Sequence, residues 1–178
     1  MDNSVCFIGH RNIAKTDKLI EKLNSTIENL IISENVCVFM FGSKSKFDDI
    51  CYEVVTSLKE KYPHITRIYV RAEYPYIDDD YKNYLLQSYE GTYFPDKLID
   101  AGKYVYVERN CEMIDKSTHC IVYYDKDYLP KRRRNSKRDL FDYQPKSGTA
   151  LAYNYAVQKK KKIINLFDML SENTEEKQ

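Results

Sequence analysis

The sequence predicts an α/β fold: a Rossmann-like three-layer sandwich whose central sheet is mostly parallel and has about five strands. Two observations carry this prediction. Short apolar stretches alternate with amphipathic helical stretches, and two of the apolar stretches end in a glycine. Such alternation is typical of βαβ units, whose right-handed crossovers bring the carboxyl ends of the strands to one edge of the sheet.

The expected strands are short runs of apolar residues, continuous in the manner of parallel strands that are buried on both faces. They are predicted at 4–8, 36–41, 65–71, 119–124 and 162–166, with a short additional strand at 103–107. Helices are predicted where apolar residues recur at spacings of three and four. These segments are 15–33, 46–62, 78–89, 109–116 and 148–160.

We expect one domain over residues 1–170, with a mobile basic insertion at 125–146 and a frayed polar tail at 171–178. The 178 residues include 28 Lys and Arg against 27 Asp and Glu, and this near balance argues against a dedicated duplex-DNA binder. No apolar run approaches the length that spans a bilayer, and no signal sequence is recognisable. We therefore expect a cytoplasmic protein without membrane attachment.

The five cysteines are odd in number and form no CxxC pair, so we expect buried reduced thiols, no metal site and no cofactor.

The first candidate ligand loop follows the strand at 4–8 and reads Gly9-His10-Arg11. A glycine lets the backbone turn sharply and approach a ligand closely. Arg11 offers a planar fork that matches phosphate, and His10 is a donor to the same anion or a proton carrier. The alternative is that Gly9 is only a turn residue and Arg11 a solvated cation.

The second candidate loop follows the strand at 36–41 and begins with Gly42 and Ser43. Ser45 and Asp48 have the spacing of a capping box at the start of the next helix. Asp48 either closes that box or faces the crevice and bonds a ribose hydroxyl. The spacing of a Walker A loop is missing.

The third candidate loop is Ser147-Gly148-Thr149, at the start of the last predicted helix. It places two hydroxyls and several free N–H groups at a helix N-terminus, which suits a phosphate. The alternative is an ordinary serine cap. From these three loops we expect one electropositive pocket for a nucleotide-like ligand at the carboxyl edge of the sheet.

Several short motifs, in the right order over most of residues 4–166, resemble the YpsA-like branch of the SLOG superfamily. They are Gly9-His10-Arg11, Phe41-Gly42-Ser43 with Phe47-Asp48 and Glu53, Leu58-Lys59-Glu60-Lys61-Tyr62-Pro63, Arg109-Asn110 with Met113-Ile114-Asp115-Lys116-Ser117, and Ser147-Gly148-Thr149 with Tyr155-Ala156. That superfamily also includes the LOG-type phosphoribohydrolases and the DNA-processing protein A domain. The resemblance implies a Rossmann-like domain that holds a nucleotide or nucleotide derivative, and it is compatible with a homodimer.

The resemblance also implies which residues line the crevice. They are Gly9, Arg11, Gly42, Ser43, Asp48, Arg109, Asn110, Gly148 and Thr149. Two departures weaken the case for LOG-type glycosidic cleavage and for a complete YpsA-like pattern. Ala152 stands where the LOG enzymes have a glutamate after their glycine-rich loop, and Ser43 and Lys44 follow Gly42 where a second glycine is common.

Glycosidic cleavage needs a carboxylate or an acid beside the anomeric carbon. Glu73, which follows the strand at 65–71, and Asp115 are the catalytic candidates, and solvated or ion-paired carboxylates are the alternative. The tyrosine-rich stretch 74–106 is read either as a wall that stacks a base or as a half-buried lid. The basic run 131–138 is read as a solvated loop or as a patch that attracts nucleic acid.

Three functions are consistent with these residues. The first is a sensor or ligand-binding protein for a nucleotide derivative, such as an ADP-ribose-like molecule. The second is an enzyme that cleaves the N-glycosidic bond of a nucleotide. The third, a single-stranded nucleic-acid binder, is disfavoured by the neutral net charge.

Overall fold

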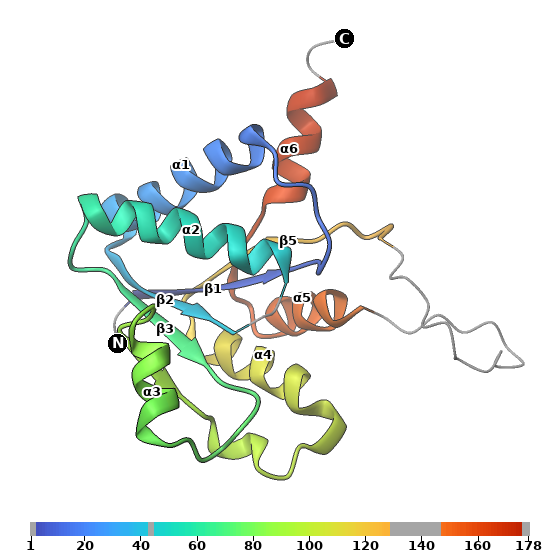
Figure 1. Ribbon diagram of the computed structural model, residues 1–178. Helices are drawn as coiled ribbons and strands as arrows, with labels where there is room; N and C mark the ends of the chain where they lie inside the picture. The colour runs from blue at the N-terminus through green and yellow to red at the C-terminus, as the bar shows by residue number, and fades with distance from the viewer. Residues whose placement is uncertain (1–2, 43–44, 129–146, 176–178) are drawn as a thin grey trace, which may run out of the picture.

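The computed structural model describes residues 3–42, 45–128 and 147–175 and confirms the α/β fold (Figure 1). Its strands are β1 (Asn3–Gly9), β2 (Val36–Phe41), β3 (Thr66–Val70), β4 (Gly91–Tyr93), β5 (His119–Tyr123) and β6 (Lys162–Asn165). Its helices are α1 (Asp17–Glu34), α2 (Lys46–Lys61), α3 (Asp79–Leu86), α4 (Val105–Lys116), α5 (Gly148–Gln158) and α6 (Leu166–Glu175). Two short 3₁₀ turns, η1 (Asp96–Leu98) and η2 (Gly102–Tyr104), precede α4.

The six strands form one sheet in the order β4-β3-β2-β1-β5-β6, and every neighbouring pair is parallel. The chain steps outward from β1 to β4 and then returns to the other side of β1 as β5, so the strand order reverses between β1 and β5. This topology is Rossmann-like. In open parallel sheets the crevice beyond the carboxyl ends at such a reversal is the usual place for a ligand.

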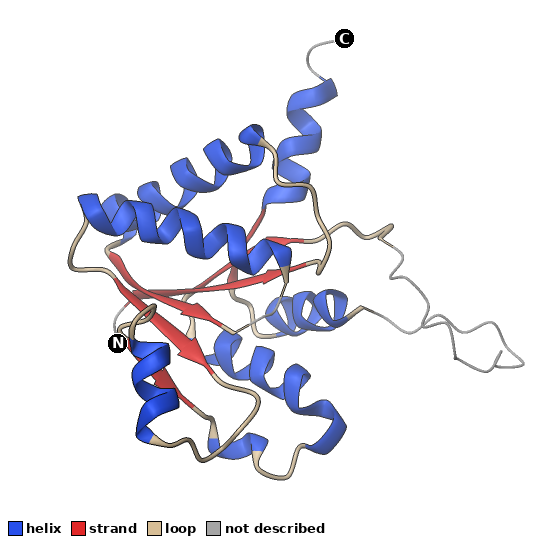
Figure 2. Cartoon of the chain, viewed as in Figure 1, coloured by secondary structure: helices blue, strands red, loops and turns tan. Residues whose placement is uncertain are grey.

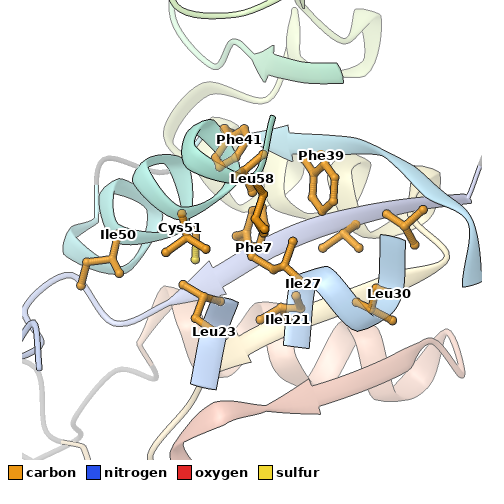
Figure 3. Close-up of a cluster of buried hydrophobic side chains, with 14 of the residues drawn as sticks. Phe7, Leu23, Ile27, Leu30, Phe39, Phe41, Ile50, Cys51, Leu58 and Ile121 are labelled. Atoms are coloured by element: carbon orange, nitrogen blue, oxygen red, sulfur yellow. The ribbon is translucent and has the colours of Figure 1, made fainter. Parts of the chain in front are cut away.

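Helices cover both faces of the sheet (Figure 2). Because successive strand residues point to opposite faces, Val5 and Phe7 pack under α1, α2 and α6, whereas Cys6 and Ile8 pack under α4 and α5. The α1/α2 side holds the larger cluster (Figure 3), where the rings of Phe7 and Phe41 stack with centroids 5.0 Å apart. Burying each such side chain stabilises the fold by roughly 1.5–3 kcal/mol.

Three of the helices begin at a hydroxyl cap, as the sequence suggested for two of them. The side chains of Thr16, Ser45 and Ser147 accept hydrogen bonds from backbone N–H groups in the first turns of α1, α2 and α5. Each bond satisfies a donor that a helix N-terminus otherwise leaves unpaired. In addition, the N–H of Lys46 donates to the carbonyl of Arg11 at 2.9 Å, which ties the start of α2 to the loop after β1.

The predicted strand at 103–107 is wrong. Val105 and Val107 belong to α4, which starts four residues earlier than expected. The buried face of this helix carries Arg109, Met113 and Ile114, and their packing selects the helix. The sixth strand is instead β4, whose three residues are too few to show a period. Helix α6 was not expected, and it extends to Glu175, within the segment predicted to fray.

The expected insertion at 125–146 lies outside the described residues except for 125–128. The described helices do not include one that combines the length and the apolar character needed to cross a bilayer.

Candidate ligand-binding site

A pocket lies at the carboxyl edge of the sheet, where β2 and β3 end and α3 and α4 approach them. It encloses about 310 Å³, counting the part that is open to solvent. The lining residues are Gly42, Tyr69, Arg71, Ala72, Glu73, Tyr81, Tyr106 and Arg109. Two guanidinium groups beside three phenol rings are suited to a ligand that carries both an anionic group and a flat ring.

Arg109 projects from the second turn of α4 and is only 4% exposed. Its Nη1 donates to the carbonyl oxygen of Gly42, and its Nε donates to the side-chain oxygen of Asn110 at 3.1 Å. Burial lowers the pKa of Arg109, while the negative charge of the buried Asp48 acts in the opposite direction. The guanidinium therefore stays charged, held in a fixed orientation at the end of β2.

A side chain at position 42 would collide with its surroundings. A Cβ there would lie 2.7 Å from the carbonyl oxygen of Val70 and 2.9 Å from both Cδ and Nη1 of Arg109. The glycine at the end of β2 is thus required because the backbone of β3 and the Arg109 side chain pack directly against it.

Arg71 is the second cation of the pocket and the first residue after β3. It is 9% exposed, and its Nη1 donates to the backbone carbonyls of Tyr74 at 2.6 Å and Pro75 at 3.4 Å. Its guanidinium lies over the ring of Phe94, 5.9 Å from the centroid. Burial lowers the pKa of Arg71. Arg71 was not among the residues predicted from the sequence, although its place directly after a parallel strand is the same signal that selected Glu73.

The two catalytic candidates lie far apart: Glu73 is beside the first turn of α4, and Asp115 belongs to its last turn. Glu73 lines the pocket, and its carboxylate accepts a hydrogen bond from the hydroxyl of Tyr106, in the first turn of the helix. Asp115 lies in the last turn, at the other edge of the sheet. Its carboxylate accepts from the hydroxyl of Tyr155 at 3.0 Å and pairs with Lys97 and Lys159 at 3.4 and 3.7 Å. The structure therefore brings only Glu73 to the pocket.

The loop after β1 lies beside this pocket, at the reversal of strand order, but does not line it. A Cβ on Gly9 would overlap the ring of Phe47 in the first turn of α2. Close packing of strand and helix thus explains this glycine without a ligand. The side chain of Arg11 is exposed to solvent.

His10 is buried at the carboxyl end of β1, with 2% exposure. Its Nε2 accepts the N–H of Asp125 at 3.0 Å, which places the proton of the neutral ring on Nδ1. Nδ1 is buried and has no hydrogen-bond partner within the described part of the chain. The ring stacks on Tyr128, with centroids 3.9 Å apart. Burial lowers the pKa of His10, so the ring is neutral at pH 7.

The start of α5 also lies at the carboxyl edge, because this helix runs back toward the beginning of β6 (Figure 1). Ser147 is its cap, with Oγ 3.1 Å from the N–H of Ala150, and Thr149 is buried. A Cβ on Gly148 would meet nothing within 4 Å, so packing does not require a glycine at this position.

The structure thus brings Gly42 and Arg109 into one pocket, with Asn110 bonded to Arg109 and Asp48 acting on its charge. The loop Gly9–Arg11 and the start of α5 lie at the same edge of the sheet without lining this pocket, and Ser43 lies outside the described residues. The residues that the sequence analysis did not select are Tyr69, Arg71, Ala72, Tyr81 and Tyr106. Tyr81 and Tyr106 fall within the tyrosine-rich stretch, but nothing in their spacing separates them from its other tyrosines.

The described residues contain no group of three or more histidine, cysteine or acidic side chains placed to hold a metal ion. A comparison of the chain with models of known protein families finds no match. A comparison with curated proteins finds no matching sequence either. The function therefore has to be argued from the site itself.

Proposed function

We propose that the protein binds a nucleotide or a nucleotide derivative at the carboxyl edge of its sheet and acts as a sensor or ligand-binding protein. One observation carries the proposal: Arg109 is a buried cation, fixed at the end of β2, in a pocket lined by tyrosines. A phosphate accepts paired hydrogen bonds from a guanidinium, and an aromatic base stacks on a phenol ring.

The fixed orientation of Arg109 supports this role. Its Nη1 and Nε are held by Gly42 and Asn110, so less side-chain freedom is lost when an anion binds. Asp48 and Glu73 act on the charge of Arg109 without forming an ion pair with it at close range. Within the described residues, the guanidinium is therefore only partly neutralised.

The tyrosines favour a ligand with a flat ring. Tyr81 from α3 and Tyr106 from α4 line the same pocket as Arg109. Stacking on such rings contributes roughly 1–3 kcal/mol per base and does not depend on which base is bound. A larger ligand of the ADP-ribose type would extend along the edge toward His10 and the start of α5.

Membership of the YpsA-like branch of the SLOG superfamily is part of this proposal. Two residues that the resemblance assigns to the crevice, Gly42 and Arg109, meet in one pocket although 67 positions separate them in the chain. The motif at Asp115 does not support a ligand contact, because that carboxylate is engaged by Tyr155 and lysines at the other edge. A cytoplasmic location remains an expectation from the sequence.

The test is ligand-dependent thermal stabilisation across a panel of nucleotides and nucleotide sugars, with mass spectrometry of any ligand that co-purifies. A compound present at 100 times its Kd should stabilise the native state by about 2.7 kcal/mol. Substituting Arg109→Gln should remove that response. Substituting Arg67→Gln, in β3 but outside the pocket, is the matched control and should retain it. If no nucleotide stabilises the wild-type protein and none co-purifies, the proposal fails.

A second candidate function, cleavage of the N-glycosidic bond, is favoured by the position of Glu73. Its carboxylate lines the pocket with Arg109 and accepts a hydrogen bond from Tyr106, so the ionised group could stabilise a developing oxocarbenium ion, or the protonated acid could give its proton to the leaving base. An enzyme of this kind would release free base from a nucleoside monophosphate. Glu73→Gln should abolish the release, and Asp115→Asn should leave it unchanged; equal activity of the Glu73→Gln variant would exclude the role.

The third function weighed above, binding of single strands, is not proposed. The exposed acids Asp78, Asp79 and Asp80 precede Tyr81 at the pocket and would repel a phosphate backbone. The basic run 131–138 lies outside the described residues.

A further inference from the structure

Arg71 is a buried cation to which the described protein offers no anion. Within residues 3–42, 45–128 and 147–175, its side chain donates hydrogen bonds only to the backbone carbonyls of Tyr74 and Pro75. No carboxylate of these ranges forms an ion pair with it. Its Nε–H is buried and has no hydrogen-bond partner there. Burying a charge and a donor in this way costs free energy unless something else pairs with them.

Arg67, in the strand that Arg71 follows, shows how an arginine with a purely structural role is surrounded in this protein. Arg67, four residues earlier, donates to both carboxylate oxygens of Glu90 at 2.7 and 3.2 Å and to the hydroxyl of Thr56 at 2.8 Å. The guanidinium of Arg67 therefore has its hydrogen-bond partners and its counter-charge within the fold. Arg71 has the same side chain, is buried, and lines a pocket.

We infer that this pocket binds the oxyanion group of a small aromatic ligand against Arg71, with Tyr81 and Tyr106 contacting its ring. The contact that holds Nη1 on the carbonyl of Tyr74 orients the guanidinium, and the buried Nε keeps a donor that no group of the described ranges accepts. Phosphate and carboxylate share the required chemistry, since both accept paired hydrogen bonds from a guanidinium. The inference rests on the proposed function only in placing the ligand at this edge of the sheet.

Three small probes that share a phenyl ring separate the parts of this inference. Phenyl phosphate and benzoate each carry a ring and an oxyanion, and phenol carries the ring alone. Titration of the wild-type protein, followed by NMR, should give tighter binding of one or both anions than of phenol, by about ten- to hundredfold. The preferred anion then identifies the group as phosphate or carboxylate. Equal affinity for all three probes, or binding of none, would overturn the inference.

The variants distinguish an anion contact from a structural role of Arg71. In Arg71→Gln, the anions should lose this tenfold or greater advantage while phenol binds as before. In Arg71→Lys, part of the advantage should remain, because the charge is kept and the fork is lost. Arg67→Gln is the matched control and should keep the full advantage. A loss that is equal for all three probes would mean that Arg71 only shapes the pocket, and the inference would fail.

A measurement on the wild-type chain covers the case in which the Gln variant does not fold. The Arg71 Nε–H resonance, assigned through its absence in Arg71→Lys, should shift when the preferred anion is added. An unchanged resonance at saturating anion would contradict the inference.

The two proposals can fail separately. If the aromatic anions bind through Arg71 but no nucleotide binds, the anion site stands and the nucleotide function falls. If nucleotides bind with unchanged affinity in Arg71→Gln, the nucleotide function stands and the site inferred here falls.

Discussion

Residues of the same type have different surroundings at the two edges of the sheet. Arg67, near the start of β3, and Arg71, just after its end, show this difference. At the amino end of the strand, Arg67 is paired with Glu90, and this hydrogen bonding raises the pKa of Arg67. Just past its carboxyl end, the side chain of Arg71 donates, within the described residues, only to backbone carbonyls, and burial lowers its pKa. A cation with a complete set of partners serves the fold, whereas Arg71 keeps a buried Nε–H that no group of the described ranges accepts.

The two buried histidines, on neighbouring strands, do not follow this contrast. His119, at the start of β5, has Nδ1 2.9 Å from the hydroxyl of Thr118, and its buried Nε2 has no hydrogen-bond partner in the described chain, the carboxylate of Glu34 lying 3.7 Å away. His10, just past the end of β1, is bonded to the backbone of Asp125 and keeps a buried Nδ1 without a partner in the described chain. A buried ring nitrogen without a partner therefore occurs at both edges of the sheet, and the contrast between the edges depends on the arginines.

The largest expected effect is on the free energy of unfolding. It tests whether the carboxyl edge of the sheet is tightly packed although the charge of Arg71 there is unpaired in the described chain. Gly9→Ala should lower the free energy of unfolding by about 3 kcal/mol, because the new Cβ would overlap the ring of Phe47. Gly148→Ala, at the same edge with nothing within 4 Å, should raise it by roughly 0.5 kcal/mol. Urea denaturation measures the free energy of unfolding of both variants. Equal changes in the two variants would show that the loop at Gly9 rearranges to accommodate the new Cβ at little cost.

The next effect compares the two arginines directly. Arg67→Met should cost about 2 kcal/mol, because the half-buried carboxylate of Glu90 loses its main partner. Arg71→Met should change stability by no more than about 1 kcal/mol in either direction, since the lost bonds to Tyr74 and Pro75 are offset by the removal of an unpaired buried charge. A cost for Arg71→Met as large as that for Arg67→Met would remove the distinction between the two residues.

A smaller effect is expected from pH. Burial lowers the pKa of both His10 and His119 below the value of about 6.5 for an unfolded chain. Their stabilising contribution is therefore complete above pH 6.5 and is lost as the pH falls through 6.5 toward the folded-state pKa, because the unfolded chain binds protons first. The free energy of unfolding, measured by urea titration between pH 7 and pH 5, should fall on acidification.

Histidine variants show which residue causes this dependence of the free energy of unfolding on pH. His10→Asn and His119→Asn should each reduce it, because burial lowers the pKa of both rings; Asp125 opposes this effect at His10, whereas at His119 the charge of Lys162 adds to it and Glu34 opposes it. A wild-type slope that neither variant changes would mean that other groups titrate in this range.

The smallest effect is predicted for Asp115, the acidic candidate at the amino edge of the sheet. Its ion pairs with Lys97 and Lys159 are partly exposed, so Asp115→Asn should cost no more than about 1 kcal/mol. Ligand-induced thermal stabilisation should be the same as in the wild type. A lost ligand response in a folded Asp115→Asn variant would show that the amino edge takes part in binding.

Much of the fold could be predicted because strand and helix periods are local properties of the chain. The buried run at 36–41 and the apolar stripe of α2 both appear where the sequence places them. The helix start at Val105 could not be predicted, because β-branched residues there favour a strand locally and only packing of Met113 and Ile114 under the sheet selects the helix. Strand β4 owes its existence to pairing with β3, since its three residues carry no pattern.

The sequence by itself determined that several strand exits meet at one edge, because the handedness of βαβ crossovers follows from chain order and from the chirality of the residues. It therefore selected Gly42 and Glu73 for the region of the pocket. Only the tertiary structure decided which charged groups are paired. Arg67 and Arg71 look alike in the sequence, whereas Glu90 forms an ion pair with Arg67 and no carboxylate of the described residues forms one with Arg71, which depends on distances between segments that lie far apart along the chain.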